Sequence, residues 1–196
     1  MRRPFGQNYA LVVAAMVFAA LLASASLRAT PGVLILPLEK AFGWDRASIS
    51  FAAAVGIFLY GLTGPFAAAL MQTFGLRRTA VLALLMMAVS TGLSTMMTQP
   101  WQYVATWGVF SGLGSGAVAS VLGATVVNRW FVERRGLVMG LLTASTATGT
   151  LIFLPAMAAL ADHGGWRPVA MTVAVTMALI APVFWLLVPE RPASIG

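Results

Sequence analysis

The stretch ALVVAAMVFAALLASASLRATPGVLILPL, residues 10–38, is long and apolar enough to cross a lipid bilayer as one helix. Further apolar segments follow it, each separated from the next by charged or turn residues. A hydrocarbon core takes about 20 mostly apolar residues per helix, and a longer segment tilts. The sequence therefore predicts six transmembrane helices, at about residues 9–38, 47–71, 79–97, 103–127, 137–161 and 169–188.

Composition places the chain in the membrane-protein class. Of its 196 residues, 60% are hydrophobic and only 9% are charged, which does not suit a water-soluble core. The formal net charge of +7 sits in short loops rather than on one clustered face, so no nucleic-acid partner is expected. With no cysteine, the chain has neither a disulfide framework nor a thiolate metal site. We expect one six-helix transmembrane domain over residues 1–196.

The N-terminus is basic, as in a signal peptide, but its apolar stretch is too long for one, so we interpret it as an uncleaved first helix. The positive-inside rule then sets the orientation. Placing both termini in the cytoplasm leaves Lys40, Arg46 and Arg167 outside. The same placement puts the following bases inside: Arg2, Arg3, Arg77, Arg78, Arg129, Arg134, Arg135 and Arg191.

Two short motifs recur along the chain. FGLRR at 74–78 is similar to GGWRP at 164–168, and FGWDR at 42–46 is similar to WFVER at 130–134. The members of each pair are three predicted helices apart, so they lie on opposite membrane faces. This pattern indicates three-plus-three inverted repeats, which are typical of secondary transporters.

Small residues mark helix surfaces that can pack closely. In the second predicted helix, FLYGLTGP at 58–65 contains Gly61, Gly64 and Pro65, and Pro65 interrupts the backbone hydrogen bonds of that helix. In the fourth, GVFSGLGSGAVAS offers Gly112 and Gly116. In the fifth, a small-residue stripe is expected to face a partner outside this bundle, and it consists of Gly136, Gly140, Ala144 and Thr148.

Three motifs together carry a family resemblance. YGLTGP followed by FGLRR, and then NRWFVERRGLVMGLLTASTATG, resembles the monocarboxylate-porter and oxalate:formate-antiporter branch of the major facilitator superfamily. In that branch the fifth helix opens with an aromatic pair, a basic run and glycines in register. Here these positions are Trp130, Phe131, Arg134, Arg135, Gly140 and Gly149. The resemblance implies an all-α fold forming the N-terminal six-helix half of a major facilitator.

The loop between the second and third helices departs from the superfamily pattern. An Asp-Arg pair usually precedes its glycine, whereas this chain has Gln72 and Thr73 before Gly75. An amide in the acidic position fits the monocarboxylate branch. Gating and topology therefore stay open as alternative roles for Arg77 and Arg78.

Arg28 is the charged residue that the first apolar stretch has to accommodate. A cation at a helix centre costs about 2.5–3.5 kcal/mol on insertion scales, so Arg28 should face the bundle interior or a watery cavity. No acid falls inside a predicted helix, and Glu39 is eleven positions on, about 16 Å along a helix. A small carboxylate would supply the missing anion, and guanidinium suits bidentate capture.

The resemblance implies the same two binding residues. Porters of this branch place a basic substrate-binding residue in the first helix and a tyrosine in the second, which correspond to Arg28 and Tyr60. We expect Arg28 to hold a carboxylate and Tyr60 to donate a hydrogen bond to it. The alternative is that the helix breaks at Pro31 and Arg28 reaches the outer interface.

These observations predict a secondary active transporter, or the N-terminal half of one, that moves a small organic anion such as a monocarboxylate by alternating access in a bacterial inner membrane. Symport and antiport both stay open. A second six-span half is expected as a separate chain, a missing C-terminal half or a second copy. The alternative function is a non-transporting sensor or assembly subunit, or an inactive truncated remnant. Neither an enzyme, a cofactor nor a metal site is expected, because no such constellation occurs.

Overall fold

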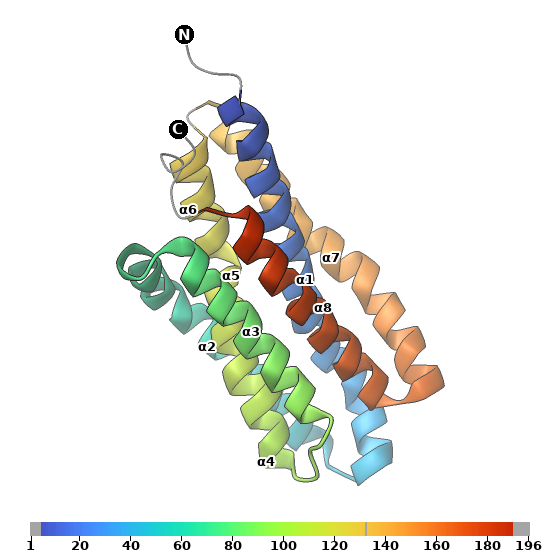
Figure 1. The fold of residues 1–196 in the computed structure, drawn as a ribbon. Coiled ribbons are helices and arrows are strands. Elements are labelled where there is room, and N and C mark those ends of the chain that lie inside the picture. Colours follow the sequence, from blue (N-terminus) through green and yellow to red (C-terminus); the bar gives the residue numbers. More distant parts are fainter. Residues whose placement is uncertain (1–4, 132, 190–196) are drawn as a thin grey trace.

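Six long helical segments run up and down through one bundle (Figure 1). The computed structural model describes residues 5–131 and 133–189. Each of the six segments is long and apolar enough to cross a membrane. Five of them are the single helices α1 (Phe5–Phe42), α2 (Arg46–Thr73), α3 (Leu76–Ser94), α7 (Arg135–Gly164) and α8 (Trp166–Leu187). The fourth segment is built from α4 (Pro100–Tyr103), the π-helix η1 (Val104–Phe110), α5 (Ser111–Val118) and α6 (Ser120–Trp130).

Several helix ends differ from the predicted ones. Helix α1 runs to Phe42 rather than residue 38, and it passes through Pro31 without ending there. Helix α3 ends at Ser94 rather than residue 97. The fourth segment begins at Pro100 rather than residue 103, since proline is favoured in the first helical turn. Where a helix is longer than predicted, its backbone hydrogen bonds continue into the polar residues beyond the apolar stretch. Helix α3 is shorter because the amides of residues 95–97 bond three residues back instead of four.

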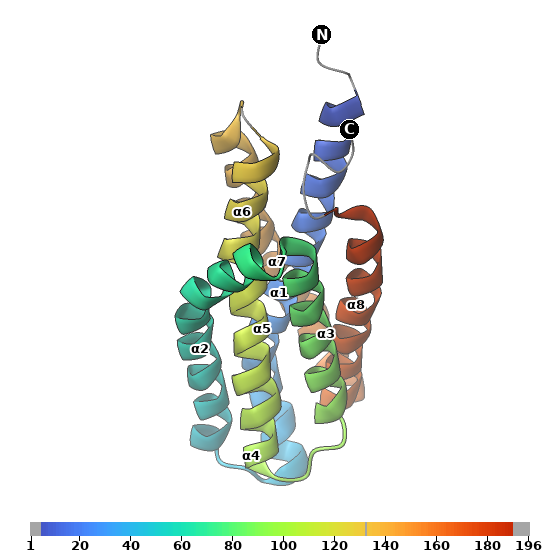
Figure 2. The same cartoon turned by 60° about the vertical axis from the view of Figure 1, so that its left-hand side comes forward.

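The packing of the helices follows the predicted inverted repeat. Helix α1 packs along α7, α2 packs along η1 and α5, and α3 packs along α8. The repeat relates α1 to the fourth segment, α2 to α7 and α3 to α8. Under this exchange, the pair of α1 and α7 becomes the pair of the fourth segment and α2, and the pair of α3 and α8 becomes itself. Figure 2 shows α2 beside α5, and α3 beside α8. The bundle therefore consists of two three-helix repeats whose helices pair across the repeats.

The same backbone turn occurs once in each repeat. Gly75 precedes α3 with φ 98° and ψ 151°, and Gly165 precedes α8 with φ 78° and ψ −164°. These two glycines are 90 positions apart and belong to the recurring motifs FGLRR and GGWRP. Glycine alone adopts such angles readily, so the recurrence has a conformational cause.

Contacts between distant residues place the start of α1 and the end of α8 at the same end of the bundle. The Tyr9 hydroxyl donates a hydrogen bond to the carbonyl oxygen of Leu187 at 2.8 Å. The Tyr9 and Trp130 ring centroids are 6.1 Å apart. Helix α1 therefore begins where α8 and α6 end, as Figure 1 also shows.

Alanine at either turn glycine should destabilise the fold. Gly75→Ala and Gly165→Ala each place a Cβ on backbone angles that side chains avoid, so we expect each to lower the free energy of unfolding by about 1–3 kcal/mol. Thermal unfolding of the purified protein in detergent measures this loss. The matched control is Gly61→Ala within α2, where an added Cβ meets nothing within 4 Å. Equal melting temperatures for Gly75→Ala and Gly61→Ala would contradict the assignment.

Candidate functional site

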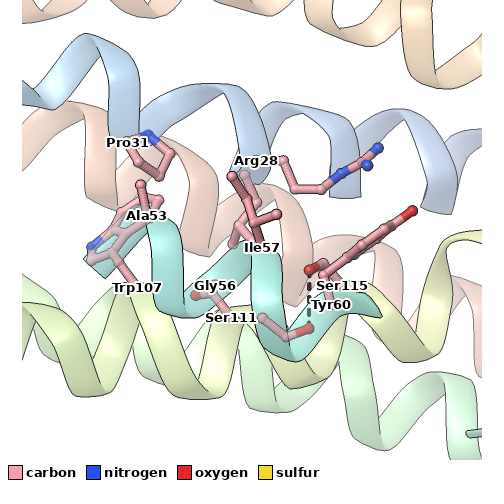
Figure 3. Close-up of a pocket in the computed structure, with 11 residues that line it drawn as sticks. Arg28, Pro31, Ala53, Gly56, Ile57, Tyr60, Trp107, Ser111 and Ser115 are labelled. Carbon is pink, nitrogen blue, oxygen red and sulfur yellow. Dashed lines mark hydrogen bonds between the residues drawn. The ribbon is translucent and has the colours of Figure 1, made fainter. Parts of the chain in front are cut away.

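Arg28 of α1 and Tyr60 of α2 lie together in the structure. The Arg28 Cζ atom is 4.9 Å from the centroid of the Tyr60 ring, a cation–π contact (Figure 3). Tyr60 is near the middle of α2 (Arg46–Thr73). The guanidinium is therefore at mid-height in the bundle. This position does not match the alternative in which Arg28 reaches the outer interface after a break at Pro31.

Arg28 has no carboxylate partner within the described residues. The ion pair found among the described residues joins Arg46, not Arg28, to Glu39, with nitrogen–oxygen distances of 2.8 and 3.0 Å. Glu39 is in the last turn of α1, not in a loop as predicted, because that helix extends to Phe42. Since Arg46 already holds the Glu39 carboxylate, Arg28 presents an exposed and uncompensated positive charge.

A cavity of about 240 Å³ lies next to this arginine, between α1 and α2. Helices η1 and α5 form its floor. The lining combines one charged residue with a tyrosine, two serines and an apolar remainder. These residues are Leu27, Arg28, Pro31, Ala53, Gly56, Ile57, Tyr60, Trp107, Ser111, Gly112 and Ser115 (Figure 3).

The polar groups on the floor of the cavity are already engaged or covered. The Ser111 hydroxyl donates to the carbonyl oxygen of Thr106 at 2.8 Å, and the Ser115 hydroxyl donates to that of Gly112 at 3.3 Å. The indole Nε1 of Trp107 is buried and has no acceptor among the described residues. The accessible hydrogen-bond donors of the cavity are therefore those of Arg28 and Tyr60.

Glycines bring the cavity floor into backbone contact with α2. An added Cβ on Gly112 would lie 2.8 Å from the carbonyl oxygen of Gly56, and one on Gly116 would lie 2.7 Å from that of Tyr60. One on Gly108, in η1, would lie 3.0 Å from the carbonyl oxygen of Ala52. Real Cβ atoms essentially never approach as closely as those on Gly112 and Gly116 would, so the contact requires glycine at these two positions. The contact also fixes how deep Tyr60 lies beside the cavity.

The close packing expected at Gly61 and Gly64 is absent from the described structure, since an added Cβ at either meets nothing within 4 Å. An added Cβ at Gly140 also meets nothing within 4 Å, which agrees with a stripe that faces away from this bundle. The second-helix glycines lie off the face of α2 that meets the fourth segment, and the neighbouring Pro65 is exposed within α2. Gly149 does pack closely, because its Cβ would lie 2.9 Å from that of Ala25 on α1. Gly140 is nine residues earlier on α7, half a turn out of phase, and so faces away from α1.

The loop-motif residues lie at the end of the bundle where α8 finishes, away from the cavity. The Arg77 Cζ atom is 4.2 Å from the Trp185 ring centroid, and its guanidinium donates to the Trp185 carbonyl oxygen at 3.5 Å. The Arg135 guanidinium donates to the carbonyl oxygen of Phe131 at 2.7 Å. Arg78 and Arg134 are exposed. Arg77 thus ties the first turn of α3 to the end of α8.

Sequence reasoning missed several lining residues. Trp107, Ser111 and Ser115 recur every fourth residue and therefore lie along one face of the fourth segment. That spacing was the available signal. Gly56 is one turn before Tyr60 on α2, and its importance depends on the partner helix, which the spacing alone does not reveal.

Family comparison agrees with the bundle and its repeat. The family model described as Major Facilitator Superfamily matches residues 16–196. The chain belongs to the Major Facilitator Superfamily. The inward-open xylose transporter XylE from E. coli has the same fold, with a TM-score of 0.71 at 16% sequence identity, over 96% of this chain and 49% of that one.

Relatives within the superfamily include proteins named as monocarboxylate transporters. Human monocarboxylate transporter 14 is 29% identical over 159 residues, covering 78% of this chain and 31% of that protein. An uncharacterized MFS-type transporter of Bacillus subtilis is 26% identical over 148 residues, covering 74% of this chain and 36% of that protein. The chain thus spans about a third of the length of these relatives and about half of the solved transporter.

Alanine at the glycine contact should displace α2. Because the Cβ of Gly112→Ala or Gly116→Ala would meet α2 backbone below 3 Å, we expect each variant to lower the free energy of unfolding by about 1–3 kcal/mol. Denaturant unfolding in detergent measures the loss. Gly140→Ala is the matched control, because its added methyl meets open space. A Gly140→Ala loss as large as that of Gly112→Ala would contradict the described packing.

Proposed function

We propose that the chain forms one half of a secondary active transporter for a small organic anion, such as a monocarboxylate, working by alternating access. Arg28 holds the carboxylate, and the Tyr60 hydroxyl donates a hydrogen bond to it. One observation carries this proposal: a mid-height guanidinium lies beside a cavity and has no carboxylate partner among the described residues. The presence of relatives named as monocarboxylate transporters supports the same substrate class.

The physical argument rests on the cost of an unpaired cation within a membrane. Such a charge is tolerated where it meets water, another charge or a ligand. The Tyr60 ring offsets part of the cost through its quadrupole, by about 0.5–2 kcal/mol. A carboxylate would offset more, since guanidinium can bind both of its oxygens at once. Tyr60 then serves both partners, its ring facing the cation and its hydroxyl free for the anion.

The proposed partner is a second six-helix half, which would complete the substrate cavity. Helices α2 and α7 are the most exposed of the six segments, and exposed apolar side chains cover much of both. The expected small-residue stripe on α7 is exposed along its whole length: Gly136, Gly140, Ala144 and Thr148. Its lack of large side chains suits a close helix–helix contact better than a lipid surface.

We place the transporter in a bacterial inner membrane with both termini in the cytoplasm. The excess of arginines in the segments at that end supports this orientation. Arg77 would then act on the cytoplasmic side, where its contact with Trp185 joins the first repeat to the second. In an alternating-access cycle that contact resists separation of α3 from the end of α8.

Charge removal at Arg28 should weaken substrate binding. We expect Arg28→Gln to raise the half-saturating concentration for transported monocarboxylates by roughly 10- to 100-fold, since a charge-assisted hydrogen bond contributes about 1.5–3 kcal/mol. Arg28→Lys keeps the charge but loses the bidentate geometry, so its half-saturating concentration should lie between those of the wild type and Arg28→Gln. Tyr60→Phe should raise the half-saturating concentration roughly two- to tenfold, because it removes one hydrogen bond. Uptake of labelled lactate, pyruvate and formate by the reconstituted transporter measures these values.

The control for this experiment is Arg129→Gln, which removes one exposed arginine at the end of α6. It should leave the half-saturating concentration unchanged. Substrate affinity that stays at the wild-type value in both Arg28→Gln and Arg28→Lys would reject the proposed anion site.

A further inference from the structure

The cavity beside Arg28 has a polar end and an apolar end (Figure 3). The Arg28 guanidinium and the Tyr60 ring and hydroxyl lie at one end. Pro31, Ala53 and Trp107 lie at the other, with Ile57 between the two ends. Such a lining suits a ligand whose charged head and apolar body occupy different ends.

Only one charge is available to a ligand in this cavity. Arg28 is the single charged residue among the described lining residues. Ser111 and Ser115 use their hydroxyl hydrogens on backbone carbonyls, so neither can donate to a second carboxylate without breaking its bond. The Trp107 nitrogen is buried and lies on the side of the ring away from Arg28. A carboxylate at the apolar end would lose its hydration without gaining a partner.

We infer that the substrate is a monocarboxylate with an apolar body, and that this body occupies the cleft between α1 and α2, against Ala53, Ile57 and Trp107. The inference rests on the proposed function, because Arg28 is the anchor for the carboxylate. It excludes dicarboxylates from the cleft and selects acids by the apolar surface that they bury.

The length of the cleft sets the size of this body. Tyr60 and Ala53 are seven residues apart on α2, a rise of about 10 Å, which accommodates an extended acid of roughly four to six carbons. The volume of about 240 Å³ is also small beside the roughly 300–1,000 Å³ of pockets for drug-sized ligands. Butyrate and hexanoate therefore fit the cleft, and longer chains extend past Trp107.

A chain-length series tests the inference directly. Binding of acetate, butyrate, hexanoate and octanoate to the purified intact protein in detergent is measured by calorimetric titration. We expect affinity to rise about two- to fourfold per methylene up to hexanoate, since each buried methylene adds a similar increment, and to stop rising at octanoate. Succinate should bind at least tenfold more weakly than butyrate. A blank titration of each acid into protein-free detergent removes uptake of the acids by the detergent itself.

Filling the apolar end should remove the chain-length effect without touching the carboxylate anchor. Ala53→Leu is expected to weaken hexanoate binding at least tenfold and to leave acetate binding unchanged. Ala69→Leu, the same substitution at an exposed position of the same helix, is the matched control and should bind both acids as the wild type does. Ile57→Ala provides a second test that does not endanger folding, because Ile57 is 74% exposed, and it should weaken hexanoate several-fold but not acetate.

The outcomes separate this inference from the proposed function. Acetate binding that Arg28→Gln leaves unchanged would overturn both. Arg28-dependent acetate binding with no gain along the series would overturn only the inference. So would succinate binding as tight as butyrate binding, or an Ala53→Leu variant that weakens acetate and hexanoate equally.

Discussion

The structure depends on the backbone contact between α2 and the fourth segment. Helices in a bilayer gain little from burying apolar side chains against one another, because lipid is equally apolar, so close approach has to supply the packing energy. Here the carbonyl oxygens of Gly56 and Tyr60 lie where side chains on Gly112 and Gly116 would be. The missing side chains therefore set the depth of α2, and with it the position of Tyr60 beside the cavity.

A second close contact fixes the other wall of the cavity. Gly149 on α7 lets α1 approach until an added Cβ would lie 3.0 Å from the carbonyl oxygen of Leu22. Helix α1 is therefore held by α7, and α2 is held by α5, each pair combining one helix from each repeat. The seam between the two pairs is left with less packing. Arg28 projects at this seam, so the inverted repeat itself accounts for a cavity at mid-height.

The sequence was sufficient to predict six helices, their order, the repeat and the proximity of Arg28 to Tyr60. These properties follow from local hydropathy, recurring turns and family resemblance. The face of each helix that contacts its neighbours was harder to predict. Spacing identifies small residues but not the rotation of a helix about its axis, which is why Gly61 and Gly64 were chosen where Gly56 makes the contact. The π-helix that carries Trp107 also changes residues per turn, and nothing in its composition marks it.

The uncompensated charge has a consequence for the proposed transport cycle. In an occluded state, water around Arg28 would be reduced while its guanidinium still lacked a carboxylate partner among the described residues. Burying an ion alone costs several kcal/mol, and a bound anion offsets much of that cost. Occlusion would therefore be easier with substrate than without it.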